Sequence, residues 1–505
     1  MAGANGVLLT GATGLLGQYL LRELTCAGHR LTALVRDSRA GTAVERAREA
    51  MAFASESAGE SLPAPTVVSG DLREPGLGLS AVDRAWLARR CRTVVHSAAS
   101  VSFRPKAASQ LQATNVEGTR RLLQVCAAVG FDNIHHVSTA FVCGDRTGVI
   151  LESDLNLGQD HHNAYERSKH DAEQVIFATE NIRATIYRPS VIVGDSQTGY
   201  TSTYHGYYRF MELADRLARP VREQGKRCLP LRLPFGGEER RDFVPVDWVA
   251  AVIARIVGHP VFHGRTYHLT TSEPMRVADI KAVAVRELGI DGIELVGPGP
   301  VSAPTDLDRA FLNGLREYWP YLGSDPVFDR RNLQAALADL PAPRIDQAMF
   351  ARMVRFAIAD GWGRRQKTTS APVGIDCGEY IERYFPDALA GSEISRIPVV
   401  AALGFEVHGP GGGQWVCHFR GGRVTDIHTG SLSGAEVVYQ MGVGTFAAVV
   451  SGRETPQAAF FGRRIEITGR IEMGLKLAAL FGRFVRECPY PETTTRERPN
   501  ATTSV

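Results

Sequence analysis

The chain has 505 residues, which is too long for one ordinary hydrophobic core and predicts two or three domains. Hydrophobic residues make up 44% and charged residues 22% of the sequence, a balance typical of a folded globular protein rather than a disordered one. The formal net charge is only +3, so a nucleic-acid partner, which needs a clustered basic surface, is not expected.

Local patterns exclude further classes. No apolar run is long enough to cross a bilayer, so we expect no transmembrane segment. The first residues lack the basic and apolar regions of a signal peptide, which favours a cytoplasmic location. The eight cysteines show neither CxxC spacing nor a pairing with histidines, so we expect no disulfide framework and no metal.

Short apolar runs rich in β-branched residues alternate with helical patterns in the first third of the chain. The expected strands cover residues 7–9, 31–35, 67–68, 94–95, 134–137 and, further on, 184–187. The clearest expected helices cover residues 18–26 and 116–128. Strands that are apolar along their whole length are buried on both faces, as in a parallel sheet covered by helices. The alternation therefore predicts a Rossmann-type, doubly wound parallel α/β sheet.

A glycine-rich loop joins the first expected strand to the helix that follows it. Its residues, in a GxxGxxG spacing rather than GxGxxG, are Thr10, Gly11, Ala12, Thr13, Gly14, Leu15, Leu16 and Gly17. Glycines let the backbone approach a pyrophosphate closely, and the helix offers free N–H groups to the anion. A simple tight turn is the alternative, but the position between strand and helix favours a dinucleotide site.

The end of the second strand bears on the choice of cofactor. Arg36 follows this strand, and Arg39 is close to it in the sequence. An arginine here can accept the 2′-phosphate of NADP, whereas an acidic residue binds the ribose 2′-hydroxyl of NAD. We therefore expect NADPH, with a solvated charged loop that includes Asp37 as the alternative. Asp71, after the third strand, is expected either to cap the adenine amine or to be a turn residue.

Tyr165 and Lys169 form a YxxxK pattern on an expected helix. Four residues are about one helical turn, so both side chains lie on the same face. A nearby ammonium and an oxidised nicotinamide both favour the phenolate, which lowers the pKa of Tyr165 from the ordinary value of about 10. Tyr165 is then expected to protonate a carbonyl oxygen as hydride arrives, and Lys169 to hold the nicotinamide ribose.

Two hydroxyl residues, Ser138 and Thr139, end the strand that precedes this helix. If the strand continues through them, their side chains point to opposite faces, so only one is expected to touch the substrate. We expect Thr139 to orient the carbonyl group, with Ser138 as the alternative.

Together these segments resemble an extended short-chain dehydrogenase/reductase over about 270 residues. Four further segments carry the resemblance: HSAASVSF at 96–103, NVEGT at 115–119, YRPSVIVGDSQTG at 187–199 and VPVD at 244–247. They are similar to the branch that contains thioester reductases, carboxylic acid reductases and fatty acyl reductases. That branch implies NADPH-driven hydride transfer to an acyl thioester, with an aldehyde or an alcohol as product. Members often follow a carrier-protein domain and none is expected here, so the acyl group is expected on coenzyme A or on a separate acyl carrier protein.

The resemblance also implies site residues. It supports Thr139, Tyr165 and Lys169 as the catalytic set, because Thr139 stands five residues before Gly144 in the family's spacing. Leu72, next to Asp71, is a further expected cofactor contact. Those expected from the matching segments are Ser97, Ala98, Ala99, Asn115, Arg188, Pro189, Ser190 and Val191.

A polar segment, residues 366–372, predicts an exposed linker between two domains. Before it lies the expected NADP-binding reductase domain with its substrate-side region, residues 1–365. After it we expect a small α+β domain at residues 373–490 and a disordered tail at 491–505. The expected elements of the small domain are a helix at 376–390, a β meander at 414–419, 424–428 and 436–440, a helix at 445–451, a strand at 464–468 and an amphipathic helix at 473–485.

The small domain resembles the sterol carrier protein type two domain, on segments 413–415, 450–453, 456–460 and 464–469. The resemblance implies an apolar tunnel that binds a lipid or acyl chain, and no residue in the domain suggests chemistry. The alternative is that its apolar residues simply fill a core; these residues are Met441, Phe446, Phe460, Phe461 and Phe481.

Three functional hypotheses follow. The leading one is an NADPH-dependent reductase of acyl thioesters, whose tethered lipid-binding domain would raise the effective concentration of substrate. The second is an NAD(P)-dependent hydroxysteroid or secondary-alcohol dehydrogenase, or an epimerase, on the same fold. The third is a non-catalytic lipid carrier, and the intact glycine loop, Thr139, Tyr165 and Lys169 argue against it.

Overall fold

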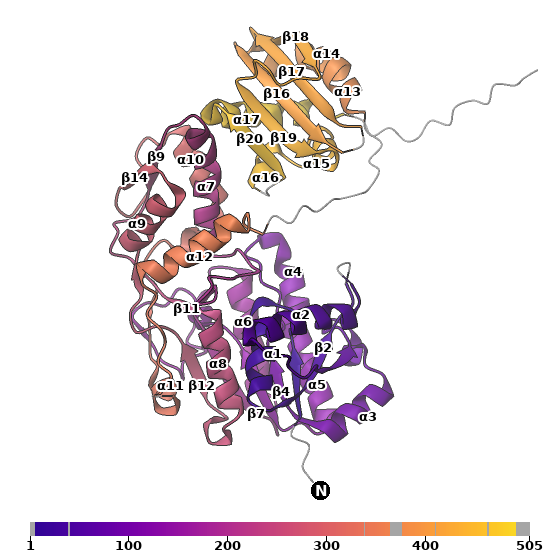
Figure 1. The fold of residues 1–505 in the computed structure, drawn as a ribbon, viewed down its shortest axis with the longest axis vertical. Coiled ribbons are helices and arrows are strands. Elements are labelled where there is room, and N and C mark those ends of the chain that lie inside the picture. Colours follow the sequence, from indigo (N-terminus) through magenta and orange to yellow (C-terminus); the bar gives the residue numbers. More distant parts are fainter. Residues whose placement is uncertain are drawn as a thin grey trace, which may run out of the picture.

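The computed structural model describes residues 6–38, 41–337, 339–363, 376–409, 411–461 and 464–490. Arg39, the expected linker at 366–372 and the expected tail at 491–505 lie outside these residues. Figure 1 shows a large sheet region, a middle group of helices with a short strand pair, and a second sheet domain beyond them.

Seven parallel strands form the central sheet of the N-terminal region. In sheet order they are β12 (Thr266–Leu269), β7 (Arg183–Pro189), β5 (Asn133–Val137), β4 (Cys91–His96), β1 (Gly6–Thr10), β2 (Arg30–Val35) and β3 (Thr66–Ser69). Every neighbouring pair is parallel. From β1 the chain adds β2 and β3 on one side, and then crosses back to add β4 and the later strands on the other side. Doubly wound sheets bind their ligands at such a switch point, which here lies between β1 and β4. The predicted doubly wound sheet is confirmed, with β12 as a strand that the sequence pattern did not reveal.

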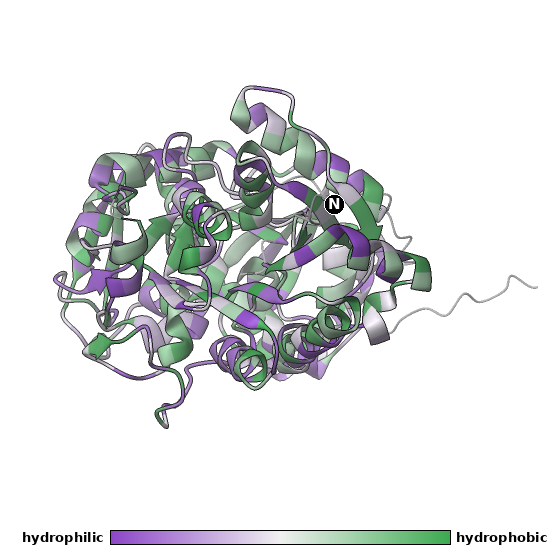
Figure 2. Cartoon of the chain, turned by 90° about the horizontal axis from the view of Figure 1, so that it is seen from below, coloured by the Kyte–Doolittle hydropathy of each residue, from purple (hydrophilic) through white to green (hydrophobic). Residues whose placement is uncertain are grey.

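Helices cover both faces of this sheet, because successive side chains of a buried strand point to opposite sides. Leu9 of β1 packs into the core on one face, and Leu8 packs into the core on the other. The covering helices are α1 (Leu15–Cys26), α2 (Ala43–Ala58) and α8 (Val246–Val257) on the first face, and α3 (Ala81–Arg90), α5 (Glu117–Val129) and α6 (Ala164–Phe177) on the second. Figure 2 shows hydrophobic strands enclosed by helices in which hydrophobic and hydrophilic residues alternate.

The middle region is built from segments that follow β7. Its main elements are α7 (Tyr207–Glu223), β9 (Cys228–Leu233), α9 (Val277–Leu288), β14 (Asp291–Leu295), α10 (Asp306–Gly314), the short helix η6 (Arg316–Tyr321) and α12 (Gln347–Ala359). Strands β9 and β14 pair in parallel. Shorter connecting elements are η4 (Ala140–Cys143), β6 (Val149–Ile150), β8 (Val191–Val193), β10 (Arg240–Arg241), β11 (Phe243–Pro245), β13 (Met275–Arg276), β15 (Val327–Phe328) and α11 (Arg331–Ala336).

The C-terminal domain is a five-stranded mixed sheet with helices. Its strands, in sheet order, are β18 (Arg423–Thr429), β17 (Gly413–Arg420), β16 (Ala401–His408), β19 (Val437–Gly442) and β20 (Ile465–Gly469). Its helices are α13 (Cys377–Glu379), η7 (Tyr380–Tyr384) and α14 (Phe385–Gly391), then α15 (Val443–Val450), α16 (Pro456–Phe461) and α17 (Ile471–Glu487).

The central strand of this second sheet, β16, was not expected. It pairs with β17 in the antiparallel sense and with β19 in parallel, so the sheet is not the simple meander that the sequence suggested. Its sequence, AALGFEVH, contains two alanines and a glycine, which are poor strand formers. The strand forms because its side chains are buried between its two neighbours and the helices.

The C-terminal domain rests on helices α7 and α10 of the middle region (Figure 1). Arg216 of α7 is only 8% exposed, and its guanidinium donates to the carbonyl oxygens of Phe460 (2.5 Å) and Ile465 (2.9 Å). Lys476 of α17 forms an ion pair of 2.7 Å with Asp306 at the start of α10. Apolar side chains of both regions belong to one continuous core cluster.

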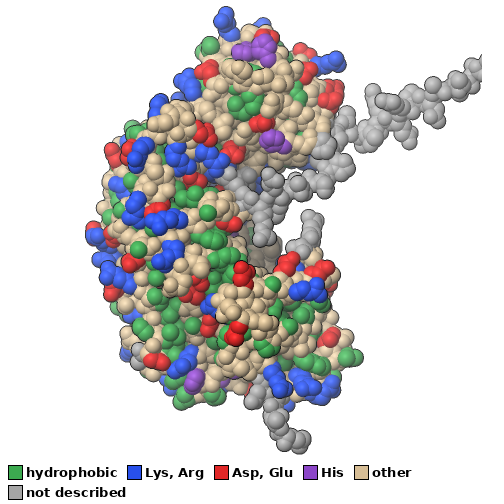
Figure 3. Space-filling model, in the orientation of Figure 1, with side chains coloured by type: hydrophobic (Ala, Val, Ile, Leu, Met, Phe, Trp, Pro, Cys, Tyr) green, Lys and Arg blue, Asp and Glu red, His purple; other side chains and the backbone are tan. Residues whose placement is uncertain are grey.

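None of the helices in the described part of the chain combines the length and apolar character of a bilayer-spanning helix. On the face drawn in Figure 3, basic and acidic side chains are intermingled, in agreement with a net charge of +3.

Candidate active site

A cavity of about 610 Å³ lies where the central sheet, α6 and the middle region meet. Small-molecule sites have volumes of ~300–1,000 Å³, so this one has the size of a ligand site. The expected site residues that line it are Gly11, Gly14, Leu15, Leu16, Gly17, Ser97, Ala99, Ser138, Thr139, Tyr165, Lys169, Pro189, Ser190 and Val191. The structure thus brings the glycine-rich loop and the YxxxK pair to one cavity.

The glycine-rich loop has the properties of an anion site. Gly11 has a φ of +78°, and a Cβ there would lie 2.6 Å from the backbone nitrogen of Ala98. A Cβ on Gly17 would overlap the carbonyl oxygen of Gly11, so the close approach of α1 to the loop requires glycine at position 17. Helix α1 begins without a side-chain cap and without an acidic residue in its first turn. Its first N–H groups are therefore suited to a pyrophosphate.

Two guanidinium groups lie beyond this loop. Arg36 is half exposed, and its side chain is 3.9 Å from the carboxylate of Asp71. Arg46 of α2 donates to the carbonyl oxygen of Arg36 (2.6 Å) and to the hydroxyl of Thr13 (3.0 Å). Sequence reasoning missed Arg46, because its position inside a helix gives no signal. Asp71 accepts from the backbone and side chain of Arg73, which makes it a turn residue in this structure.

Some expected cofactor residues lie behind the cavity wall rather than on it. The Thr10 hydroxyl bonds to His96 Nδ1 (2.8 Å) and accepts from the backbone N–H of Ala98 (3.2 Å), which ties the glycine loop to the end of β4. Asn115 donates to the hydroxyl of Ser168 (2.9 Å). Ser168 lies between Tyr165 and Lys169 on the same helical turn. Leu72 packs into the core below the loop. These residues position the cavity wall.

Arg188 departs from the expectation. It is fully buried, and its guanidinium pairs with Glu173 of α6 (2.7 Å) and donates to the carbonyl oxygen of Asp154 (2.7 Å). Its side chain does not line the cavity. A buried charge needs such partners, and through them Arg188 joins β7 to α6.

The YxxxK pair stands on the first turns of α6. Asn163 caps the helix by accepting from the backbone N–H of Glu166 (3.0 Å). Lys169 is buried, and its Nζ donates to the carbonyl oxygen of Val137 at the end of β5 (2.6 Å). Burial lowers the pKa of Lys169 to about 8, against a smaller opposite effect of the Glu173 carboxylate.

The pKa of Tyr165 differs in direction from the expectation. Burial, and then the neighbouring carboxylate of Glu166, raise this pKa above its ordinary value. Tyr165 is therefore fully protonated at neutral pH, as a proton donor must be.

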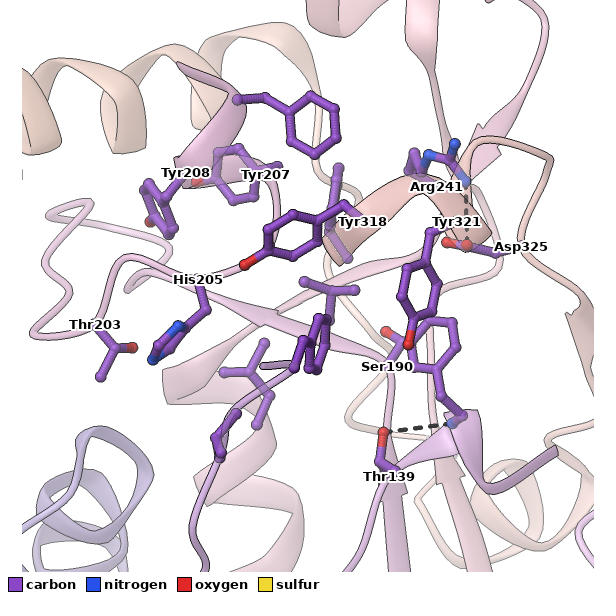
Figure 4. Close-up of a pocket in the computed structure, with 18 of the residues that line it drawn as sticks. Thr139, Ser190, Thr203, His205, Tyr207, Tyr208, Arg241, Tyr318, Tyr321 and Asp325 are labelled. Carbon is purple, nitrogen blue, oxygen red and sulfur yellow. Dashed lines mark hydrogen bonds and ion pairs between the residues drawn. The ribbon is translucent and has the colours of Figure 1, made fainter. Parts of the chain in front are cut away.

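Ser138 and Thr139 both line the cavity, and the expectation that only one of them touches the substrate stays a prediction. Strand β5 ends at Val137, so the alternation of side chains does not extend to them. Thr139 caps η4 by accepting from the backbone N–H of Phe141 (3.4 Å), which is marked in Figure 4. The Ser138 hydroxyl is buried and has no hydrogen-bond partner among the described residues. The Ser138 hydroxyl is thus available to a carbonyl oxygen, whereas the Thr139 hydroxyl donates to the carbonyl oxygen of Pro189 (3.5 Å) and would have to exchange this long hydrogen bond.

Beyond Tyr165 and Lys169 the cavity continues as an apolar pouch between α7, β9, α9, β14 and α10. Its wall includes Phe210, Met211, Ala214, Leu231, Leu233, Ile280, Ala284, Ile293, Leu295 and Phe311. Figure 4 shows Tyr318 and Tyr321 projecting into the space above Thr139, and the ion pair of Arg241 with Asp325 at its edge. None of these residues was identified from the sequence, because the irregular order of strands and helices after β7 hid which segments meet.

The fold and the site together define a short-chain dehydrogenase/reductase-type domain, with a glycine loop at the switch point of the sheet and a YxxxK pair facing it. Residues 9–253 match a family of NAD-binding domains described as male sterility protein, and residues 393–482 match the SCP-2 sterol transfer family. The chain therefore carries an NAD-binding domain of the male sterility protein family, followed by an SCP-2 domain. The resemblance to the thioester reductase branch is confirmed.

Solved structures and curated relatives agree with this assignment. The terminal R domain of the myxalamid biosynthetic pathway is similar over 72% of this chain and 93% of that domain, with a TM-score of 0.58 and 25% identity. A thiolation-reductase di-domain of an archaeal nonribosomal peptide synthetase shares the fold, with a TM-score of 0.55, 18% identity, and coverage of 71% of this chain and 76% of that one.

Among curated proteins, a linear gramicidin synthase from Brevibacillus parabrevis is 34% identical over 391 residues, 72% of this chain. A nonribosomal peptide synthetase of Aspergillus flavus is 29% identical over 301 residues, 56% of this chain. The large subunit of L-2-aminoadipate reductase from Penicillium chrysogenum is 30% identical over 297 residues, 53% of this chain. The matched segments make up 7%, 28% and 19% of these relatives, so the chain corresponds to a part of each.

Proposed function

We propose that this protein is an NADPH-dependent reductase that converts an acyl thioester to an aldehyde or an alcohol. The observation that carries the proposal is the single cavity shared by the glycine loop, the pair Tyr165 and Lys169, and an apolar pouch. The glycine loop would hold the pyrophosphate, and bound NADPH would supply a hydride to the thioester carbonyl carbon.

The chain's own residues would do the rest. Ser138 and Thr139 donate hydrogen bonds to the carbonyl oxygen and fix its direction. Tyr165 gives its proton to this oxygen as negative charge develops on it, which yields a hemithioacetal. The C–S bond of the hemithioacetal then breaks and its hydroxyl proton passes to the departing sulfur, so that an aldehyde and the free thiol of coenzyme A or of the carrier protein are released. Lys169 holds the nicotinamide ribose and carries the positive charge that favours the phenolate left behind. The acyl group lies in the apolar pouch, where its burial supports binding.

Preference for NADPH over NADH is supported by Arg36 and Arg46. The Arg46 guanidinium contacts the backbone carbonyl of Arg36 and the hydroxyl of Thr13, beyond the end of β2. A guanidinium there can accept the 2′-phosphate that only NADP carries.

The test is NADPH oxidation with a panel of acyl-coenzyme A and acyl carrier protein substrates, with the products identified by mass spectrometry. The proposal expects oxidation only when a thioester is added, and the products distinguish aldehyde from alcohol. The panel also identifies the donor, coenzyme A or carrier protein. If none of the thioesters in the panel causes NADPH oxidation, the proposal is contradicted.

The apolar pouch also supports a second candidate, a hydroxysteroid or secondary-alcohol dehydrogenase, because a sterol is equally apolar. This candidate expects NAD(P)⁺ to be reduced by a sterol or secondary alcohol, without any activity on thioesters. The same absorbance assay, run in the oxidative direction, separates the two.

For the C-terminal domain we propose binding of a lipid or acyl chain, as its family suggests. The cavity inside this domain is about 40 Å³, room for about three water-sized spheres. It is lined by apolar residues such as Phe385, Phe405 and Phe481, which would have to move to admit a chain. Titration with a fluorescent fatty acid tests this; no saturable binding would leave the aromatic residues as core.

A further inference from the structure

Tyr321 reaches from the end of η6 to the first turn of the catalytic helix α6. Its hydroxyl donates to the carboxylate of Glu166 and accepts from the side-chain amide of Asn163 (2.5 Å). Asn163 and Glu166 stand on either side of Tyr165 in the sequence. A single hydroxyl from a segment about 155 residues away therefore holds both flanks of Tyr165.

The ring of Tyr321 makes a second connection to the same place. It stacks on Phe103 with a centroid distance of 5.7 Å and an interplanar angle of 25°. The ring of Phe103 is in turn 5.8 Å from that of Tyr165. The hydroxyl contacts and the ring contacts converge on Tyr165 from different directions.

Glu166 explains why the hydroxyl is needed. Its carboxylate is 1% exposed, and a buried carboxylate is costly unless it is hydrogen-bonded. Besides Tyr321, it accepts from the backbone N–H of His162 (2.9 Å) and faces His162 Nδ1 at 3.2 Å. His162 is the imidazole that this carboxylate contacts, and its hydrogen bond to Glu166 raises the pKa of His162. The carboxylate also acts on His161, whose pKa burial nevertheless lowers.

We propose that Tyr321 is a positioning residue that clamps the first turn of α6 through Asn163 and Glu166, and so fixes the hydroxyl of Tyr165 toward the carbonyl of the substrate. The inference rests on the proposed role of Tyr165 as proton donor. Since Tyr321 belongs to the middle region that also forms the apolar pouch, it joins the substrate wall to the catalytic helix.

The main test is the Tyr321→Phe variant, which keeps the ring contacts and removes both hydroxyl contacts. A displacement of about 1 Å of a reacting group costs roughly 100-fold in rate, so we expect kcat to fall roughly tenfold to 100-fold. The KM for the acyl thioester and the NADPH dissociation constant, measured by fluorescence without turnover, should stay within about threefold of wild type. A loss caused by general destabilisation would change these constants too.

Two further variants complete the test. Tyr267→Phe is the matched control: it removes another tyrosine hydroxyl bond, to the carbonyl oxygen of Phe262 (2.6 Å), away from the cavity, and should leave kcat unchanged. Asn163→Ser keeps a helix-capping side chain but loses the amide that contacts Tyr321, and should lower kcat in the same direction. This variant decides the question if Tyr321→Phe does not fold.

The outcomes separate the two proposals. If Tyr321→Phe and Asn163→Ser both keep kcat within twofold of wild type while Tyr165→Phe is inactive, the clamp is overturned and the reductase proposal stands. If Tyr165→Phe is itself active, the proposed catalytic role fails, and the clamp with it. A fall in kcat for both variants, with unchanged NADPH binding, supports the clamp.

Discussion

The Nζ atom of Lys169 lies 2.6 Å from the carbonyl oxygen of Val137, the last residue of β5. His136 Nε2, from the same strand, is 3.4 Å from the same ammonium. The contact joins α6, which carries Tyr165, to the sheet edge where Ser138 and Thr139 begin. It fixes the position of α6 relative to these two hydroxyl residues.

The lowered pKa of the buried Lys169 predicts a loss of activity as the pH rises through about 8. The ammonium of Lys169, whose pKa burial lowers to about 8, is present below this pH and lost above it. A neutral amine supports neither the phenolate nor the ribose, so kcat should decline on the alkaline side. In Lys169→Arg the charge persists, because the guanidinium pKa exceeds 12, and any remaining activity should lack this decline. An identical alkaline limb in both proteins would show that another group titrates.

Replacing Tyr165 by Phe should lower kcat by roughly 10²- to 10⁴-fold, the range of general acid catalysis. The NADPH dissociation constant should remain within a few-fold of wild type, because only one hydroxyl is lost. Stopped assays of aldehyde formation and fluorescence titration measure the two quantities. Rates near those of wild type would remove Tyr165 from the mechanism.

Arg36→Ala should weaken NADPH binding far more than NADH binding. A charged hydrogen bond contributes about 1.5–3 kcal/mol, which is roughly ten- to 100-fold in the dissociation constant. Arg46→Ala should act in the same direction, because the Arg46 guanidinium donates to the backbone carbonyl of Arg36 and so lies in the same place. Arg48→Ala, an exposed arginine of the same helix, serves as the control. Equal losses for both cofactors would contradict the role in 2′-phosphate binding.

Ala214→Phe should shorten the acyl chain that the enzyme accepts. Ala214 is a buried residue of α7 on the wall of the pouch, so a phenyl ring there occupies part of its volume. Overpacking costs about 1–3 kcal/mol of stability, which a melting curve measures separately. The ratio kcat/KM, determined across chain lengths, should fall for long thioesters and persist for short ones. Ala214→Ser, of similar size, should keep the wild-type order.

The sheet and the glycine loop were predictable because their signals are local. Apolar runs such as residues 31–35 identify buried strands wherever they occur. Gly17 is required by its contact with Gly11 inside the loop, and Gly11 by its positive φ, although its close neighbour Ala98 comes from the end of β4. The YxxxK pair was likewise readable, since its spacing fixes one helical face.

Other parts of the site depend on contacts between distant segments. Tyr321 is tied to Glu166 across about 155 residues, and Arg46 meets Arg36 only because α2 folds back beside β2. Arg188 stands in a segment typical of the family, yet its charge is taken by Glu173. No spacing in the sequence reveals such pairings.

Helix α7 touches two different environments along its length. Phe210 and Met211 face the pouch, while Arg216, less than two turns further on, is held by backbone oxygens of the C-terminal domain. Suppose that a ligand of the C-terminal domain binds better to one mutual arrangement of the two domains than to another, and that the ligand of the pouch also prefers one of these arrangements. Thermodynamic reciprocity then requires each ligand to change the affinity of the other by the same factor. Helix α7, which contacts both, is the element through which such a coupling would pass.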